Sequence, residues 1–122
     1  MKAIAMIFGA LVTLLTPMVL QAYSPQEAIC LANGYSTSRC AQKTIQQATC
    51  FVGGYQDSRC DGMTVPEAIC FINDYSKSRC EGLSASEAEC FVKGIQSSWC
   101  SEMPHSVAIC YSHGLSAPER CK

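Results

Sequence analysis

Cysteine recurs in this chain once every ten residues, and no other feature restricts the possible folds as strongly. The ten cysteines are Cys30, Cys40, Cys50, Cys60, Cys70, Cys80, Cys90, Cys100, Cys110 and Cys121. With a period of 20, most of the chain becomes five copies of one unit with two cysteines each: 21–40, 41–60, 61–80, 81–100 and 101–121. Tandem units of this length indicate stacked supersecondary elements rather than one irregular domain.

The first 22 residues show the order of features of an export signal. Lys2 supplies a positive start, residues 3–15 are apolar, and a less apolar run ends at the small residue Ala22. We predict a signal peptide over 1–22 and a mature, secreted or periplasmic domain over 23–122. The uncharged run 3–26 is also long enough to span a bilayer, so an uncleaved anchor is the alternative. After cleavage we expect no membrane association.

Charge and cysteine spacing exclude several classes of partner and cofactor. The mature chain carries eight Lys and Arg (nine minus Lys2) against ten Asp and Glu, with no basic cluster, so nucleic acid is not expected to bind. An even cysteine count in a short exported chain predicts full pairing in an oxidising compartment. Structural zinc sites use cysteines about two to four residues apart. No such spacing occurs, so we predict neither a metal nor another cofactor.

Each of the first four units contains a capping box, in which a Ser or Thr is followed three residues later by Glu or Gln. The pairs are Ser24 and Glu27, Thr44 and Gln47, Thr64 and Glu67, and Ser84 and Glu87. This pattern predicts that a helix starts at the same position of each repeat. The fifth repeat lacks the capping box, because Pro104 stands at the cap position.

Ten residues after each cap position stands a glycine or an Asp, which tolerates a positive φ and ends a helix. These residues are Gly34, Gly54, Asp74, Gly94 and Gly114. The first helix of unit one is therefore predicted over 25–33. The polar segment 36–41 is predicted to form a second helix of one to two turns, since it lacks the β-branched and aromatic residues of a strand. The fold class is thus all-α, a stapled array of five short helical hairpins, solenoid-like or compactly stacked.

The position of the turn within each unit favours one disulfide pattern. Gly34 lies midway between Cys30 and Cys40, so we predict one disulfide inside each hairpin. The pairs are Cys30–Cys40, Cys50–Cys60, Cys70–Cys80, Cys90–Cys100 and Cys110–Cys121. Cysteine count alone also permits a ladder that joins Cys40 to Cys50 and continues between successive repeats.

The interval of nine residues between cysteines resembles the twin motif of small helical proteins of the mitochondrial intermembrane space, in which two helices are joined by two disulfides. The resemblance covers the spacing alone. Those proteins have helix throughout the interval, whereas here Gly34 or its equivalent interrupts it, and an export signal precedes the array. Membership of that family is therefore not inferred.

Two columns of side chains recur beside the cysteines. Alanine fills positions 28, 48, 68, 88 and 108, which predicts close approach of helices, and the aromatic column Phe51, Phe71, Phe91 and Tyr111 is predicted to be core. The candidate binding row is Arg39, Arg59, Arg79, Trp99 and Arg120. Such a row suits carboxylates or an anionic glycan, and a Trp is a frequent binding hot spot. The alternative is that each Arg pairs internally with a carboxylate of the Glu27 type or with a helix end.

Catalytic residues are scarce, so we predict that the protein is not an enzyme. His105 is predicted in a loop after Pro104 and His113 at a helix C-terminus, and no acid–base pair or phosphate loop occurs. We predict a non-catalytic binding, interaction or structural module with a protein or glycan partner, which uses positions 29, 33, 37 and 41, variable between repeats. The alternative is a secreted effector such as a protease inhibitor or antimicrobial-type protein.

The exported protein should begin at Tyr23 and contain no free thiol. We expect its intact mass to lie ten hydrogens below that of the reduced chain, because all ten cysteines are predicted to pair. Labelling of the native protein by a thiol reagent before reduction would contradict full pairing.

Overall fold

A computed structural model describes residues 23–114, and this part of the chain is all-helical with no strand. The α-helices are α2 (Pro25–Ala32), α3 (Ile45–Val52), α4 (Val65–Ile72), α5 (Ala85–Val92) and α6 (His105–Ser112). The 3₁₀ helices between them are η2 (Thr37–Arg39), η3 (Asp57–Cys60), η4 (Lys77–Cys80) and η5 (Ser97–Cys100). The predicted all-α class is confirmed, and the second helix of each of the first four units is one 3₁₀ turn.

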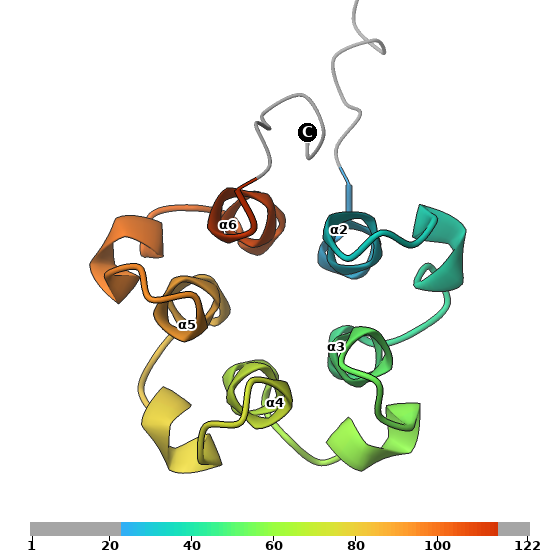
Figure 1. Ribbon diagram of the computed structural model, residues 1–122, viewed down its shortest axis with the longest axis horizontal. Coiled ribbons are helices and arrows are strands. Elements are labelled where there is room, and N and C mark those ends of the chain that lie inside the picture. Colours follow the sequence, from blue (N-terminus) through green and yellow to red (C-terminus); the bar gives the residue numbers. More distant parts are fainter. Residues whose placement is uncertain (1–22, 115–122) are drawn as a thin grey trace, which may run out of the picture.

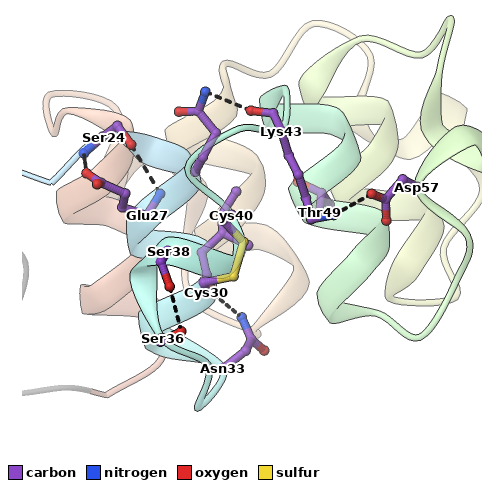
Figure 2. Close-up of a disulfide and its surroundings, with 12 residues drawn as sticks. Ser24, Glu27, Cys30, Asn33, Ser36, Ser38, Cys40, Lys43, Thr49 and Asp57 are labelled. Atoms are coloured by element: carbon purple, nitrogen blue, oxygen red, sulfur yellow. Dashed lines mark hydrogen bonds and ion pairs between the residues drawn. A yellow bond between two sulfur atoms is a disulfide. The ribbon is translucent and has the colours of Figure 1, made fainter.

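The predicted capping boxes start the first four helices. At α2 the Glu27 backbone N–H donates to Ser24 Oγ at 3.2 Å, and the Ser24 N–H donates to Glu27 Oε1 at 3.0 Å (Figure 2). The same reciprocal pair begins α3, α4 and α5. Helix α6 follows Pro104 without a side-chain cap, as its sequence predicts. Each box satisfies backbone donors that a helix start otherwise leaves open.

Each helix ends where the sequence predicts a residue of positive φ. Gly34 has φ +87° and Asp74 has φ +67°. The Tyr35 N–H then bonds the Cys30 carbonyl at 2.9 Å, and the Gly34 N–H bonds the Leu31 carbonyl, so the chain folds back over the last helical turn. This reversal sends the chain from the helix toward its 3₁₀ turn.

In each of the first four repeats a disulfide joins the helix to the 3₁₀ turn that follows it. The pairs Cys30–Cys40, Cys50–Cys60, Cys70–Cys80 and Cys90–Cys100 are formed, with Cα–Cα distances of 5.9 to 6.1 Å. Figure 2 shows the first of them, Cys30–Cys40. Four of the predicted pairs are therefore confirmed, and the ladder between repeats is excluded. The fifth predicted pair, Cys110–Cys121, includes Cys121, which lies outside the described residues. The predicted export signal over 1–22 and Arg120 of the predicted binding row also lie outside them.

The repeats form a closed ring. Figure 1 views the α-helices end-on, side by side around the ring, with the 3₁₀ helices outside them. Each helix packs against the next, and α6 packs against α2, which closes the ring. In this closing contact Ile109 and Cys110 share a buried cluster with Ala28 and Ile29. The sequence predicted a repetitive stack but not its closure.

The helices of the ring all run in the same direction. The Gln26 amide Nε2 donates to the carbonyl of Lys43 at 3.1 Å, and Ser86 Oγ donates to the carbonyl of Met103 at 2.8 Å. Each bond joins the first turn of one helix to the residue just before the cap of the next helix. Neighbouring N-termini are therefore side by side, and all C-termini surround the opposite end of the ring axis.

The alanine column lies where adjacent helices meet. Ala28, Ala48, Ala68, Ala88 and Ala108 are all 0% exposed. The prediction of close packing at these positions is confirmed. A larger side chain there would have to displace a neighbouring helix, because protein interiors have no spare volume.

Gly53 provides a test of the packing between α3 and α4. Its φ of −83° suits any residue, but an added Cβ would lie 2.8 Å from Ile72 Cβ and 2.9 Å from Ile72 Cγ2. We expect Gly53→Ala to lower the free energy of unfolding by about 1–3 kcal/mol through overpacking. Lys93→Ala is the matched control, since Lys93 is the exposed cap of α5 and should shift stability by less than about 0.5 kcal/mol.

Denaturant unfolding of the oxidised protein measures both variants. Equal stabilities of Gly53→Ala and Lys93→Ala would show that the two helices have room to separate, against the packing described.

Candidate functional site

The predicted binding row lies on the outer rim of the ring. Arg39, Arg59 and Arg79 occupy η2, η3 and η4, Trp99 occupies η5, and all four are exposed. These 3₁₀ helices are the outermost elements of the ring in Figure 1. The four residues, which we call the rim row, thus stand at equivalent places in four successive repeats.

A pair of aromatic rings lies beneath each arginine of the rim row. Tyr35, just after α2, contacts Phe51 of α3 with ring centroids 4.9 Å apart and an interplanar angle of 50°. Tyr55–Phe71 and Tyr75–Phe91 repeat this tilted contact at 4.8 and 5.1 Å. Each pair joins two neighbouring repeats. Of the aromatic column predicted to be core, Phe51, Phe71 and Phe91 are half-buried at the repeat junctions, whereas Tyr111 is exposed, so the prediction is wrong for Tyr111.

Each guanidinium group of the row stacks over its aromatic pair. Arg39 Cζ lies 5.7 Å from the Tyr35 ring centroid and 5.1 Å from that of Phe51. Arg59 and Arg79 repeat the arrangement on their own pairs, at 5.3 to 5.7 Å. This geometry is a cation–π interaction with both rings.

The arginines have no carboxylate partner within residues 23–114, where the ion pairs are Lys43–Asp57 and His105–Glu89. The alternative of internal pairing with Glu27-type residues is thus not what the structure shows. Aromatic faces hold the guanidinium groups instead. Their N–H groups make no hydrogen bond within this part of the chain and remain open to an external acceptor.

The junction between α5 and α6 departs from this arrangement. Ile95 stands in place of the tyrosine, Tyr111 in place of the phenylalanine, and Trp99 in place of the arginine. Trp99 is 62% exposed and Tyr111 is 39% exposed. The rim row therefore changes from stacked cations to an exposed aromatic surface in the fourth repeat.

A second candidate site lies on the ring axis, where the sequence did not predict one. The column Ile29, Thr49, Ile69, Glu89 and Ile109 is buried and lines a cavity of about 180 Å³. The expectation that position 29 and its equivalents form part of an exposed interaction surface is therefore wrong. Closure of the ring turns this face of every helix inward.

Glu89 in the wall of this cavity forms a buried polar pair with His105. His105 Nε2 lies 2.9 Å from Glu89 Oε2, and the two side chains are 11% and 8% exposed. The prediction of a loop position for His105 is wrong, since it is the first residue of α6. A signal was present in the sequence: Glu89 interrupts a column that is otherwise Ile or Thr, and His105 aligns with Ile45, Val65 and Ala85.

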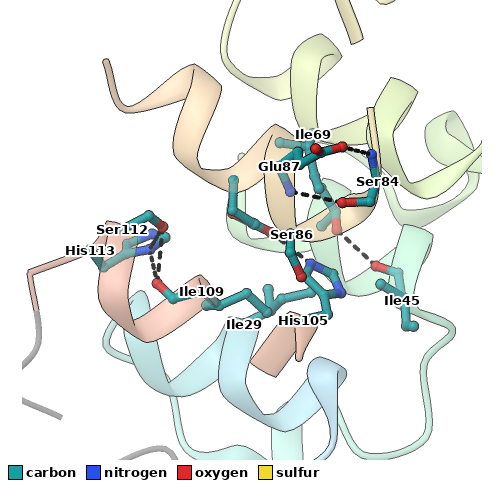
Figure 3. Close-up of polar contacts among 12 residues, drawn as sticks. Ile29, Ile45, Ile69, Ser84, Ser86, Glu87, His105, Ile109, Ser112 and His113 are labelled. Carbon is teal, nitrogen blue, oxygen red and sulfur yellow. Dashed lines mark hydrogen bonds and ion pairs between the residues drawn. The ribbon is translucent and has the colours of Figure 1, made fainter. Parts of the chain in front are cut away.

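His113 caps the C-terminus of α6, as predicted, and its Nδ1 lies 2.7 Å from the Ile109 carbonyl (Figure 3). Ser112 Oγ also donates to this carbonyl, at 3.1 Å. Ser112 Oγ also lies 3.5 Å from His113 Nδ1, but both atoms are hydrogen-bonded to the Ile109 carbonyl oxygen. The arrangement does not make His113 a base for the hydroxyl.

Among residues 23–114 no three His, Cys, Asp or Glu side chains gather closely enough to hold a metal ion. Every helix in this range is too short to cross a membrane. Comparisons of the chain with known protein families, with curated proteins and with solved structures found no match.

The stacking of Arg79 on Phe91 should be measurable as a coupling energy. In a double-mutant cycle of Arg79→Ala and Phe91→Leu, we expect the two changes to couple by about 0.5–1 kcal/mol, the usual size of an exposed cation–π contact. Lys77→Ala replaces Arg79→Ala in the control cycle, because Lys77 lies in the same 3₁₀ helix without a ring contact. Equal coupling in both cycles would mean that the stack contributes nothing.

Proposed function

We propose that this protein is an exported binding module that engages a carboxylate-bearing macromolecule, protein or glycan, through its rim row and catalyses no reaction. One observation carries the proposal: three guanidinium groups, in three successive repeats, are held on aromatic faces, and their N–H donors have no partner among residues 23–114. The four disulfides are typical of proteins from an oxidising, extracellular-type compartment and support export.

The stacked geometry suits recognition of carboxylates. A guanidinium group presents a planar fork of donors that matches a carboxylate with two parallel hydrogen bonds. Because the ring pair already fixes the side chain, less conformational entropy is lost when a partner binds. Trp99 would add apolar contact area at the end of the row, and exposed tryptophans are frequent hot spots.

The negative net charge of the chain does not oppose this proposal. Charges interact over a Debye length of about 8 Å at physiological salt, so a partner at the rim responds to the local row more than to distant carboxylates. Three cations at repeat spacing would favour a partner whose own acidic groups recur, such as an acidic polysaccharide or an acidic segment of a polypeptide.

The surroundings of the two histidines support the proposal that the protein catalyses no reaction. His105 is buried against Glu89, and His113 is bonded to the Ile109 carbonyl. Neither imidazole stands beside an exposed nucleophile in the described part of the chain. A rigid, stapled scaffold with an outward row of donors favours binding over catalysis.

The test is capture of a partner from native extracellular or periplasmic fluid, compared between two single variants in one 3₁₀ helix. Arg79→Met keeps an aliphatic cover over the rings but removes the donors, whereas Lys77→Met removes the same charge two residues away. We expect Arg79→Met to weaken capture about tenfold or more, the cost of one charged hydrogen-bonding group. Lys77→Met should have little effect.

The combined variant Arg59→Met, Arg79→Met and Trp99→Ala should abolish capture while the melting temperature changes little. Undiminished capture by the combined variant would remove the rim row as the site. A large fall in melting temperature with capture retained would make the row purely structural.

A further inference from the structure

The ring encloses a cavity whose walls are partly apolar. Ile29, Ile69 and Ile109 line it at the level of the buried column, and Figure 3 shows them reaching from α2, α4 and α6 into the interior of the ring. Val52 and Ile72 add apolar surface nearer the C-terminal ends of their helices. At about 180 Å³ the cavity slightly exceeds an engineered one of about 150 Å³ that takes up benzene. It therefore suits a small organic molecule.

The polar members of the buried column offer hydrogen-bond acceptors. Glu89 Oε2 is engaged by His105, whereas Glu89 Oε1 has no hydrogen-bond partner within residues 23–114. The Thr49 hydroxyl donates to the Ile45 carbonyl at 2.8 Å, so its remaining capacity is that of an acceptor. Both residues line the cavity. Among residues 23–114 no side-chain nitrogen or oxygen that is shielded from solvent lacks a hydrogen-bond partner, so Glu89 Oε1 is open to solvent. A donor that enters the cavity can therefore reach this oxygen.

The part of the cavity wall at the helix C-termini, which includes Asn33, Asn73 and His113, is also rich in hydrogen-bond acceptors. The amide Nδ2 groups of Asn33 and Asn73 donate to the Ile29 and Ile69 carbonyls at 2.7 and 2.8 Å, and neither Oδ1 atom has a hydrogen-bond partner in the described part of the chain. In the neutral tautomer that donates from Nδ1 to its carbonyl, His113 presents Nε2 as an acceptor. The C-terminal ends of parallel helices add partial negative charge at this end of the ring.

The cation nearest the cavity is Lys93, the cap residue of α5, which also lines the wall. It is exposed and forms no ion pair with Glu89 one helical turn earlier. Its flexible stem allows the ammonium group to stay in water at the mouth of the cavity. Lys93 therefore leaves the inner acceptors open.

We propose that the axial cavity binds a small primary ammonium ion with a short aliphatic body. The ammonium group donates to Glu89 Oε1 and to Thr49 Oγ1, and the alkyl chain packs against the isoleucines. This ligand brings a charged donor to the open inner acceptors, and its body fits the apolar wall. The site is separate from the rim row, so neither proposal depends on the other.

The test is an NMR titration of the oxidised mature protein with n-butylammonium chloride, alongside 1-butanol and sodium butyrate at matched ionic strength. We expect saturable shifts of the amides that surround the cavity with n-butylammonium. The uncharged alcohol lacks the charge-assisted bond and should bind about tenfold more weakly or worse, and butyrate should not bind.

Variants locate the site. Glu89→Gln should weaken n-butylammonium binding about tenfold or more, whereas Glu102→Gln, which removes an exposed carboxylate on the surface, should leave it unchanged. Thr49→Val removes the second acceptor without removing the buried charge, and should weaken binding even where Glu89→Gln fails to fold.

Three results would overturn the proposal. Equal affinity for 1-butanol and n-butylammonium would show that the cavity binds only the alkyl chain. Tighter binding of butyrate than of n-butylammonium would show that the Lys93 ammonium group, rather than Glu89, determines the charge of the ligand. Absence of any saturable shift would show that the inner acceptors are closed to solutes.

Discussion

The rest of the structure depends on the disulfide that joins each helix to its own outer turn. Helices of eight residues have almost no stability alone, because the cost of nucleation is spread over too few hydrogen bonds. Each staple closes a chain segment with a sequence separation of 10, a constraint worth about 2.5–3 kcal/mol in the chain-entropy description. The staple also places a buried sulfur pair between helix and turn, where repeats of this size have little other core. The capping boxes and the glycine ends give the segments their lengths, but the disulfides keep them in place.

Closure of the ring gives these repeats an inside and an outside. In an open array the terminal repeats expose an unpartnered face and need special caps. Here α6 covers α2, so each of the five helices has a neighbour on both sides. Since all helices run in one direction, one column of each helix faces the axis and their C-termini gather at one end. The same closure places the 3₁₀ turns on the rim, where each presents one side chain of the rim row.

The fourth repeat concentrates the departures from the common pattern. Glu89 enters the axial column, Lys93 replaces a small or amide residue at the helix end, and Trp99 replaces the stacked arginine. A buried carboxylate and an exposed tryptophan both cost stability or solubility, and neither is needed to hold a ring that the other repeats build without them. Positions that break a local rule are where functional demands are expected, which is why both candidate sites include this repeat.

The sequence by itself determined the helix starts and the helix ends, and it favoured the pairing that four disulfides show. The capping box at Ser24, the positive φ of Gly34 and the Cys30–Cys40 pair are all interactions within about ten residues, so their signals are local and recur at a fixed phase. Only the tertiary structure decided that Ile109 meets Ile29, that Arg39 stacks on Phe51 of the next repeat, and that His105 reaches Glu89. These contacts depend on the angle between successive repeats, and that angle follows from the packing of whole helices around a shared axis. A periodic sequence determines the local structure of each repeat. The sum of the small rotations between successive repeats decides whether they form an open array or close into a ring.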